Sequence, residues 1–353
     1  MNLLNVVPTE ARAVLQEWLE QRGAPPFRLR QIVPRLWRRP VPTWSAASAL
    51  PPPLAAALEE AFPLPRLTAT RRQISRDGTV KYLWELPDGQ AVESVLIPEG
   101  HRQTLCLSSQ AGCAYGCVFC ATGRMGLERH LDPWEIAAQV RELALESPPA
   151  WPTNVVFMGM GEPLHNWDAV DPALTILNAP DGCGIGARHI TVSTVGLIPR
   201  LARLAQRPEQ FRLALSLHAS SSDKRRRLMP VERKYPLHQV MVALRQFRRR
   251  VTFEYVMIKD TNDTAADAAD LADLARPLGA LVNLLPLHPG GAGGLAPTPP
   301  AGIRAFAASL REQGISVSVR KSRGLDIAAA CGQLRVETES AGRVRAEQHR
   351  HIE

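Results

Sequence analysis

Short apolar runs alternate with longer amphipathic stretches from about residue 104 onward. The runs predict strands at 104–109, 153–159, 188–194, 211–218, 251–258, 281–287 and 315–321. The stretches between them predict helices, and the clearest has Asp132 as its cap, Pro133 in its first turn and Glu135 closing a capping box. Because strands that alternate with helices form parallel sheets, about six such units predict an α/β barrel or an open part-barrel.

The first hundred residues follow a different pattern. Residues 1–65 are predicted to be helical, with helices within 10–23, 26–40 and 47–62. The runs 81–86 and 91–97 flank the turn signal Pro-Asp-Gly-Gln, which predicts a β-hairpin. We therefore divide the chain into a helical accessory domain (1–65), a hairpin region (66–100), a barrel core (101–335) with a flexible loop at 290–300, and a loose polar tail (336–353). Whether the helical domain contacts RNA or is a plain appendage stays open.

Composition and charge narrow the class of protein. The 353 residues are 45% hydrophobic and 22% charged, as in ordinary globular proteins. Neither a membrane-spanning run of ~20 apolar residues nor a signal peptide is evident, so we expect a cytoplasmic protein without membrane contact. The net charge of +8 favours a polyanionic partner, nucleic acid first.

Four of the six cysteines lie within residues 106–120, CLSSQAGCAYGCVFC. In a reducing compartment such crowding indicates metal or redox chemistry, and soft thiolates select iron–sulfur clusters or zinc. A structural zinc site has four protein ligands, usually from two C-x2-C units, whereas Cys113, Cys117 and Cys120 provide three. Three thiolates on a four-iron cluster would leave one iron open to a substrate. A zinc site or unrelated core thiols remain as alternatives.

Polar residues collect where the predicted strands end. They are Gly161 and Glu162 after 153–159, Ser193, Ser216 with His218, and His288. Because these strand ends share one rim of a barrel with the cysteine loop, we expect a common site there. Cys331, in an Ala-rich stretch, is either a buried small residue or a nucleophile. Cys183 is left as a structural or incidental thiol.

The spacing C-x3-C-x2-C, with Phe119 before the last cysteine, resembles radical S-adenosylmethionine (SAM) enzymes. The resemblance implies a partial (β/α)6 TIM-like barrel and one [4Fe-4S] cluster bound by Cys113, Cys117 and Cys120. It also implies that the open iron chelates SAM, which is cleaved to methionine and a 5′-deoxyadenosyl radical.

Further stretches resemble the RlmN/Cfr family of radical SAM RNA methyltransferases. They are VESVLIPEGHRQTLCLSSQAGCAYGCVFCATG, GMGEPL, ITVSTVG, LALSLHA, FEYVMIKDTND, VNLLPL and, most diagnostic, VRKSRGLDIAAACGQL. They span about residues 75 to 335, and PPFRLRQIVPRLW resembles the family's N-terminal helical domain.

This resemblance implies a two-SAM mechanism. A first SAM methylates Cys331, and the radical from a second SAM activates that methyl group, which then adds to an adenine ring carbon of RNA. Cys106 releases the product through a transient disulfide with Cys331, and Glu93 matches the proton acceptor. Positions that match SAM contacts are Gly161, Glu162, Ser193, Ser216, Leu217, His218 and His288. At His288 the chain departs from the family pattern, which usually has Asn there.

The expected substrate is carbon 2 of an adenosine in 23S rRNA, with tRNA as a second candidate. Cfr-type methylation of carbon 8 is the alternative, and a different radical SAM enzyme, such as a glycyl-radical activase, or a zinc-containing RNA-binding module is a more distant one. An electron donor such as flavodoxin and a monomeric state are expected. Three basic runs, 224–227, 245–250 and 319–323, are either solvated surface or phosphate contacts, and 224–227 is expected nearest the site.

Overall fold

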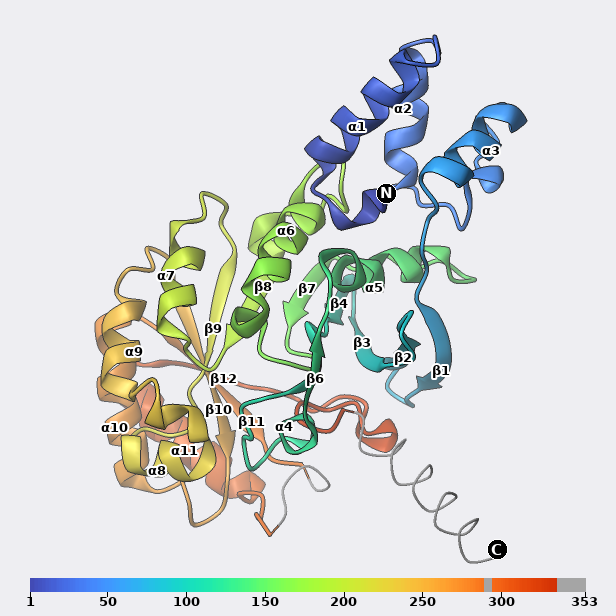
Figure 1. Cartoon of the computed structure of the whole chain (residues 1–353). Helices are drawn as coiled ribbons and strands as arrows, with labels where there is room; N and C mark the ends of the chain where they lie inside the picture. The colour runs from blue at the N-terminus through green and yellow to red at the C-terminus, as the bar shows by residue number, and fades with distance from the viewer. Residues whose placement is uncertain (289–293, 335–353) are drawn as a thin grey trace, which may run out of the picture.

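A computed structural model describes residues 1–288 and 294–334 and centres on one ten-stranded sheet (Figure 1). The strand order is β1-β2-β3-β4-β7-β8-β9-β10-β11-β12, and all neighbours from β4 to β12 are parallel. These parallel strands are β4 (Arg102–Cys106), β7 (Asn154–Phe157), β8 (Ile190–Thr194), β9 (Arg212–Ser216), β10 (Val251–Met257), β11 (Leu281–Pro286) and β12 (Ser316–Val319). The predicted α/β part-barrel is therefore confirmed.

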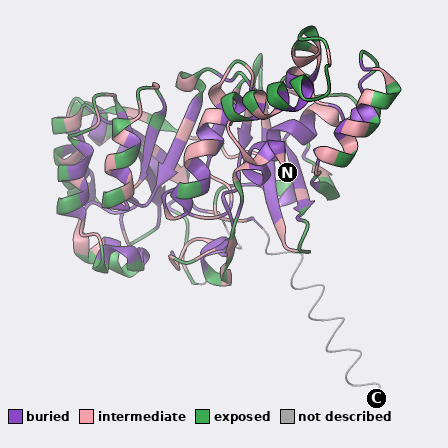
Figure 2. Ribbon diagram, turned by 45° about the horizontal axis from the view of Figure 1, so that its top comes forward, coloured by how far each residue is buried: buried purple, intermediate pink, exposed green. Residues whose placement is uncertain are grey.

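Helices connect the parallel strands and bury one side against them, with the other side exposed (Figure 2). They are α5 (Pro133–Leu145), α6 (Trp167–Asn178), α7 (Ile198–Gln206), α8 (Ser222–Leu228), α9 (Leu237–Leu244), α10 (Ala265–Ala275) and α11 (Pro300–Glu312). The predicted capping box of α5 is present, and the Asp132 N–H donates to the Glu135 carboxylate over 2.8 Å. Short 3-10 helices are η1 (Leu3–Asn5), η2 (Val33–Arg35), η3 (Trp44–Ala46), η4 (Pro163–Asn166), η5 (Ala187–His189), η6 (Pro230–Arg233), η7 (Arg276–Leu278) and η8 (Leu325–Ile327).

The N-terminal helices α1 (Pro8–Glu20), α2 (Phe27–Ile32) and α3 (Pro52–Ala61) lie beyond α5 and α6 at one end of the molecule (Figure 1). The helix predicted over 26–40 is too long: Pro34 has no N–H to continue the α-helical hydrogen bonds, and α2 gives way to the 3-10 helix η2 at Val33. The buried Arg141 of α5 donates to the carbonyls of Leu36 (3.0 Å) and Val41 (2.6 Å). This arginine ties the helical segment to the barrel.

The predicted hairpin is confirmed as β2 (Val80–Glu85) and β3 (Ala91–Glu99), which pair antiparallel. A further strand, β1 (Thr68–Ile74), extends this part of the sheet; its mostly exposed residues carry no alternating pattern that sequence reasoning could use. The strand predicted over 104–109 ends at Cys106. Beyond it, β5 (Gln110–Cys113) and β6 (Gly126–His130) form a separate two-stranded sheet around α4 (Ala121–Met125).

Some expectations concern residues outside the described ranges. The tail 336–353 lies there entirely, and so does part of the loop at 290–300. Within the described ranges, every helix is too short or too polar to cross a membrane.

Candidate active site

The cysteine loop leaves β4 at the carboxyl end of the parallel sheet and returns to it through α5. Cys113 closes β5, and Cys120 directly precedes α4. Gly112 has a φ of +76°, and a Cβ there would collide with the Gly126 carbonyl oxygen. A glycine is thus required for the tight pairing that sets the cysteines in place.

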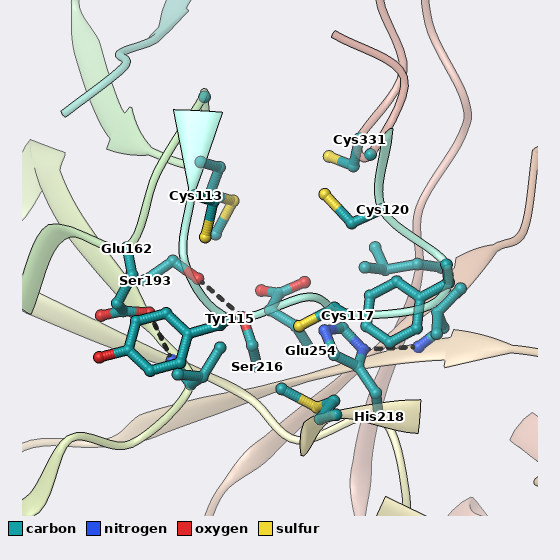
Figure 3. Close-up of a pocket in the computed structure, with 18 of the residues that line it drawn as sticks. Cys113, Tyr115, Cys117, Cys120, Glu162, Ser193, Ser216, His218, Glu254 and Cys331 are labelled. Atoms are coloured by element: carbon teal, nitrogen blue, oxygen red, sulfur yellow. Dashed lines mark hydrogen bonds between the residues drawn. The ribbon is translucent and has the colours of Figure 1, made fainter. Parts of the chain in front are cut away.

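The three cysteines of this loop line one cavity (Figure 3). None of them is in a disulfide, and burial raises the pKa of the Cys113 thiol to about 12. Burial also raises the pKa values of the Cys117 and Cys120 thiols. Cys117 is buried and the other two are half-buried, and three thiols that line a common space are a donor set that suits a soft metal, with iron binding in place of their protons.

Gly161 and Glu162 form the next part of the cavity wall. Gly161 has a φ of +96°, and a Cβ there would lie 2.5 Å from the Gln110 Cβ, so the chain needs glycine to pass. The buried Glu162 carboxylate accepts from the N–H groups of Leu164 (3.0 Å) and Val195 (2.8 Å). Burial raises its pKa to about 7. This carboxylate therefore fixes the turn after β7 to the end of β8.

The ends of β8 and β9 bring two hydroxyls to the same wall. The Oγ atoms of Ser193 and Ser216 are 3.3 Å apart, and both residues line the cavity. Leu217 does not reach it: its side chain is in the core, and its N–H donates to the Glu254 carbonyl. The two serines can offer hydroxyls to a bound molecule, whereas Leu217 cannot contact one through its side chain.

His218 is held in one orientation beneath the cysteine loop. Its Nδ1 accepts from the Val256 N–H over 3.1 Å, and its ring meets the Phe119 ring edge-on at 4.7 Å between centroids. Burial lowers the pKa of His218 to about 3. The ring is consequently neutral at physiological pH, with Nδ1 as the acceptor.

His288 also faces the cavity but is engaged by a neighbour. Its Nε2 lies 2.6 Å from the Ser322 Oγ, and burial lowers its pKa. The side chain thus reaches the site where the family usually carries Asn, but one of its ring nitrogens is bonded to the C-terminal segment.

Cys106 and Cys331 come together although they lie far apart in the sequence. Both line a second, smaller cavity that shares Arg320 and His288 with the first. Cys106 is buried at the end of β4, whereas Cys331 is exposed. The Gly332 carbonyl accepts from the Ala121 N–H over 2.7 Å, which fixes the Cys331 segment to the cysteine loop. Figure 3 shows the sulfurs of Cys331 and Cys120 pointing into the same space.

Glu93 occupies a different place from the other candidates. It is buried on β3, and neither cavity includes it in its wall. Its Oε1 lies 3.4 Å from the Lys81 Nζ, which also donates to the Ala328 carbonyl over 3.3 Å. Glu93 is therefore linked to the Cys331 segment through Lys81.

Two charged residues that line the cavity were not among the site residues predicted from the sequence. Glu254 of β10 lines it and accepts from the Asn283 amide over 2.8 Å. A carboxylate within the apolar run 251–258 was a usable signal, because buried charges need partners. Arg320 was assigned only to a basic run, and its sequence context gives no sign of a position between Cys106 and Cys331.

The basic runs do not form the surface that their sequence suggests. In 224–227, Arg225 is fully buried against Glu232 and Lys224 is paired with Asp267 at 2.6 Å, which leaves Arg226 and Arg227 as the exposed cations of this run. The run 245–250 immediately precedes β10, and so lies at the end of the sheet opposite the site.

Comparison with known proteins identifies the family. The model of the radical SAM superfamily matches residues 107–274. A probable dual-specificity RNA methyltransferase RlmN of Gemmatimonas aurantiaca is 54% identical over 354 residues, covering 99% of this chain and 98% of that protein. The dual-specificity RNA methyltransferase RlmN of Syntrophobacter fumaroxidans is 42% identical over 331 residues, covering 92% and 96%. The crystal structure of a radical SAM methyltransferase from Sphaerobacter thermophilus is 44% identical, with a TM-score of 0.88, and covers 96% of this chain and 100% of that one. The chain therefore belongs to the RlmN family of radical SAM RNA methyltransferases.

Proposed function

We propose that this enzyme methylates carbon 2 of adenine in 23S rRNA and in tRNA, with Cys331 as the carrier of the methyl group. The names of the curated relatives support an RNA substrate and a dual specificity. The observation that carries the proposal is the convergence of Cys106 and Cys331 on one cavity beside the cysteine loop. Another radical SAM enzyme would have no use for such a pair.

Family membership implies SAM and an iron–sulfur cluster, and the residues present fit both. Cys113, Cys117 and Cys120 would hold the cluster, for which we propose the [4Fe-4S] type. When bound, the cluster and SAM supply the methyl group and a 5′-deoxyadenosyl radical. The hydroxyls of Ser193 and Ser216 are available to bind SAM.

A protein-bound carrier answers a chemical difficulty. Carbons 2 and 8 of adenine are electrophilic, so they do not accept a methyl cation directly, and a radical on a methyl group attached to Cys331 reverses that polarity. The cost is a covalent bond between Cys331 and RNA. In the proposed release step, Cys106 attacks the Cys331 sulfur and forms a disulfide while the bond from that sulfur to the RNA-bound carbon breaks. This carbon keeps the electron pair and takes up a proton to become the methyl group.

Glu93 is the proposed acceptor of the proton that leaves the adenine ring. Its carboxylate pairs with Lys81, which donates to the Ala328 carbonyl of the Cys331 segment, and this link supports a place for Glu93 near the reacting base. Target adenine has to leave its stack to reach so enclosed a site. Arg323, on the wall of the smaller cavity, is placed to contact a phosphate near the entrance. RNA contact by residues 1–65, a flavodoxin as electron donor and a monomeric state stay predictions.

Nucleoside mass spectrometry tests the proposal. Total rRNA and tRNA would be digested from cells that carry the wild-type gene, no gene, or the variants Cys331→Ala and Cys183→Ala. We expect 2-methyladenosine to disappear without the gene and with Cys331→Ala. Cys183→Ala is the matched control, because Cys183 is buried away from both cavities and its carbonyl accepts from Arg38. Loss of 8-methyladenosine alone would show the Cfr-type reaction, and unchanged methylation with Cys331→Ala would refute the proposal.

A further inference from the structure

Arg320 lies at the boundary between the two cavities and lines both. It directly follows β12, and its N–H donates to the Leu284 carbonyl of β11 over 2.9 Å, so its backbone is anchored in the sheet. The guanidinium approaches the Met158 sulfur, with Nη1 at 4.0 Å. The half-buried guanidinium therefore faces groups that line the two cavities.

The groups that Arg320 serves are the two reactive thiols. Arg320, Cys106 and Cys331 line the smaller cavity together, and the Arg320 charge lies close enough to lower the pKa of the Cys106 thiol. The Glu254 carboxylate attracts it from β10. Arg320 therefore links both partners of the proposed disulfide to the wall of the SAM cavity.

Cys106 needs such a neighbour because its surroundings are otherwise apolar. Its partners across the sheet are Val95 of β3 and Val156 of β7. Burial raises the pKa of the Cys106 thiol to about 12, and the Arg320 charge acts against this rise. The Lys81–Glu93 pair shares this face of the sheet and carries no net charge. Arg320 is thus the cation that shares the cavity wall with Cys106 and acts on its sulfur.

We propose that Arg320 prepares Cys106 for the release step by stabilising the thiolate that forms when the thiol loses its proton, and by directing the sulfur at Cys331. This inference rests on the proposed function. The Cys106 proton passes to the solvent, the thiolate attacks the Cys331 sulfur, and the sulfur–carbon bond to RNA breaks as the disulfide forms. The departing carbon takes the electron pair and a proton. An external dithiol then supplies the two electrons that reduce the disulfide. Only the thiolate attacks at a useful rate, so the charge of Arg320 governs this step.

The experiment measures the covalent protein–RNA adduct in the full-length, cluster-loaded enzyme. Arg320→Met, Arg320→Lys, Cys106→Ala and, as an exposed control on α11, Arg304→Met would be compared. After one turnover with labelled RNA, the adduct is followed on denaturing gels between pH 7 and pH 9, and methylation of Cys331 is measured by peptide mass spectrometry. Cys106→Ala should trap the adduct permanently.

With Arg320→Met, we expect normal methylation of Cys331, normal formation of the adduct and release at least ~10-fold slower, since one pKa unit is a tenfold change in thiolate. Because the pKa of the Cys106 thiol is about 12 even beside Arg320, release should accelerate with pH between pH 7 and pH 9 in both proteins, with the wild type faster at each pH. Arg320→Lys, which keeps the charge, should be intermediate, and it carries the same test if the methionine variant does not fold. Arg304→Met should behave as the wild type.

Several results would overturn the inference. One is release from Arg320→Met at the wild-type rate while Cys106→Ala traps the adduct. Another is failure of Arg320→Met to bind SAM, to methylate Cys331 or to form the adduct, because Arg320 would then act before release. If Cys106→Ala itself forms no adduct, the proposed function fails, whatever Arg320 does.

Discussion

Replacing Arg225 by methionine is expected to destabilise the fold and weaken the cysteine loop, although the residue belongs to a basic run. Its Nη1 pairs with the Glu232 carboxylate, and its Nη2 donates to the Val195 carbonyl over 2.6 Å. Both charged side chains are at most 1% exposed. The same helix touches the cysteine loop, because the Leu228 carbonyl accepts from the Val118 N–H over 3.0 Å. Arg225 thus fixes the position of α8, the helix that is hydrogen-bonded to the cysteine loop.

The magnitude follows from the buried pair. Removing one partner of such a pair leaves an uncompensated charge and costs about 3–5 kcal/mol of unfolding free energy. Adding Glu232→Gln removes that charge while keeping an acceptor for the Leu237 N–H, which now donates to Glu232 over 2.8 Å, so we expect the double variant to recover at least ~1 kcal/mol. The matched control is Arg226→Met: Arg226 is 53% exposed, its partner Asp223 is 84% exposed, and the loss should stay within ~0.5 kcal/mol.

Urea unfolding, followed by far-ultraviolet circular dichroism, gives the three free energies. Iron per chain after anaerobic reconstitution reports the state of the cysteine loop, and it should fall for Arg225→Met while staying at the wild-type value for Arg226→Met. A cost for Arg225→Met no larger than for Arg226→Met would refute the reasoning, because the buried pair would then contribute nothing to the fold.

Three further predictions concern the site. Gly112→Ala should lower the iron content and reduce the unfolding free energy by more than ~2 kcal/mol, because both its φ of +76° and its packing exclude a Cβ. Gly100→Ala is the control: Gly100 has a φ of +57° but no atom within 4 Å, so this variant should lose only the backbone strain of about 1 kcal/mol. Equal losses in the two variants would contradict the steric argument. Burial lowers the pKa of His218 to about 3, so the unfolded chain binds the extra proton between about pH 3 and pH 6.5, and stability falls as the pH drops through that window. Between pH 7 and pH 5 the wild type should lose about 2 kcal/mol of unfolding free energy through His218, and urea unfolding of His218→Asn should lack this part of the loss. The same loss in both proteins would show that the folded chain does not keep the ring neutral. His288→Ala should weaken SAM binding ~10-fold in calorimetry, whereas His288→Asn should stay within about threefold of the wild type. If both variants bind SAM as the wild type does, the bond to Ser322 holds the ring away from SAM and the prediction is refuted.

Local signals in the sequence were reliable wherever one short stretch determined the structure. The Asp132 capping box and the hairpin around Pro-Asp-Gly-Gln are formed as predicted, since each depends on residues within a few positions. The edge strand β1 and the β5–β6 sheet were missed, because an exposed strand lacks alternation and a four-residue strand is too short to show it. The helix over 26–40 was overextended because its apolar pattern outweighed Pro34.

The candidate site likewise contains some residues whose positions could be predicted from the sequence and others whose positions could not. Strand ends that carry Ser193, Ser216 and His218 could be placed on one rim from the sequence, because parallel strands share their carboxyl ends. The nearness of Cys106 and Cys331 could not be derived in that way and came only from the family resemblance. It depends on the C-terminal segment crossing back over β4, and no local pattern encodes that path.

The buried Arg225 and the half-buried Arg320 show why a basic run is a poor guide to an RNA-binding surface. A guanidinium leaves water only where fixed acceptors replace most of its hydration, and Arg225 has a carboxylate and a carbonyl, although its Nε has no partner. Arg225 is therefore not free to meet a phosphate, and Arg320 faces the cavities, although both count toward the net charge of +8. The long-range attraction for RNA is a property of the whole charge, whereas recognition at the site depends on the few cations that remain exposed at its mouth. In this fold, a position in a basic run therefore says less about a residue's role than the acceptors around it: Arg225 stabilises the cysteine loop, and Arg320 faces the thiols on which the proposed chemistry depends.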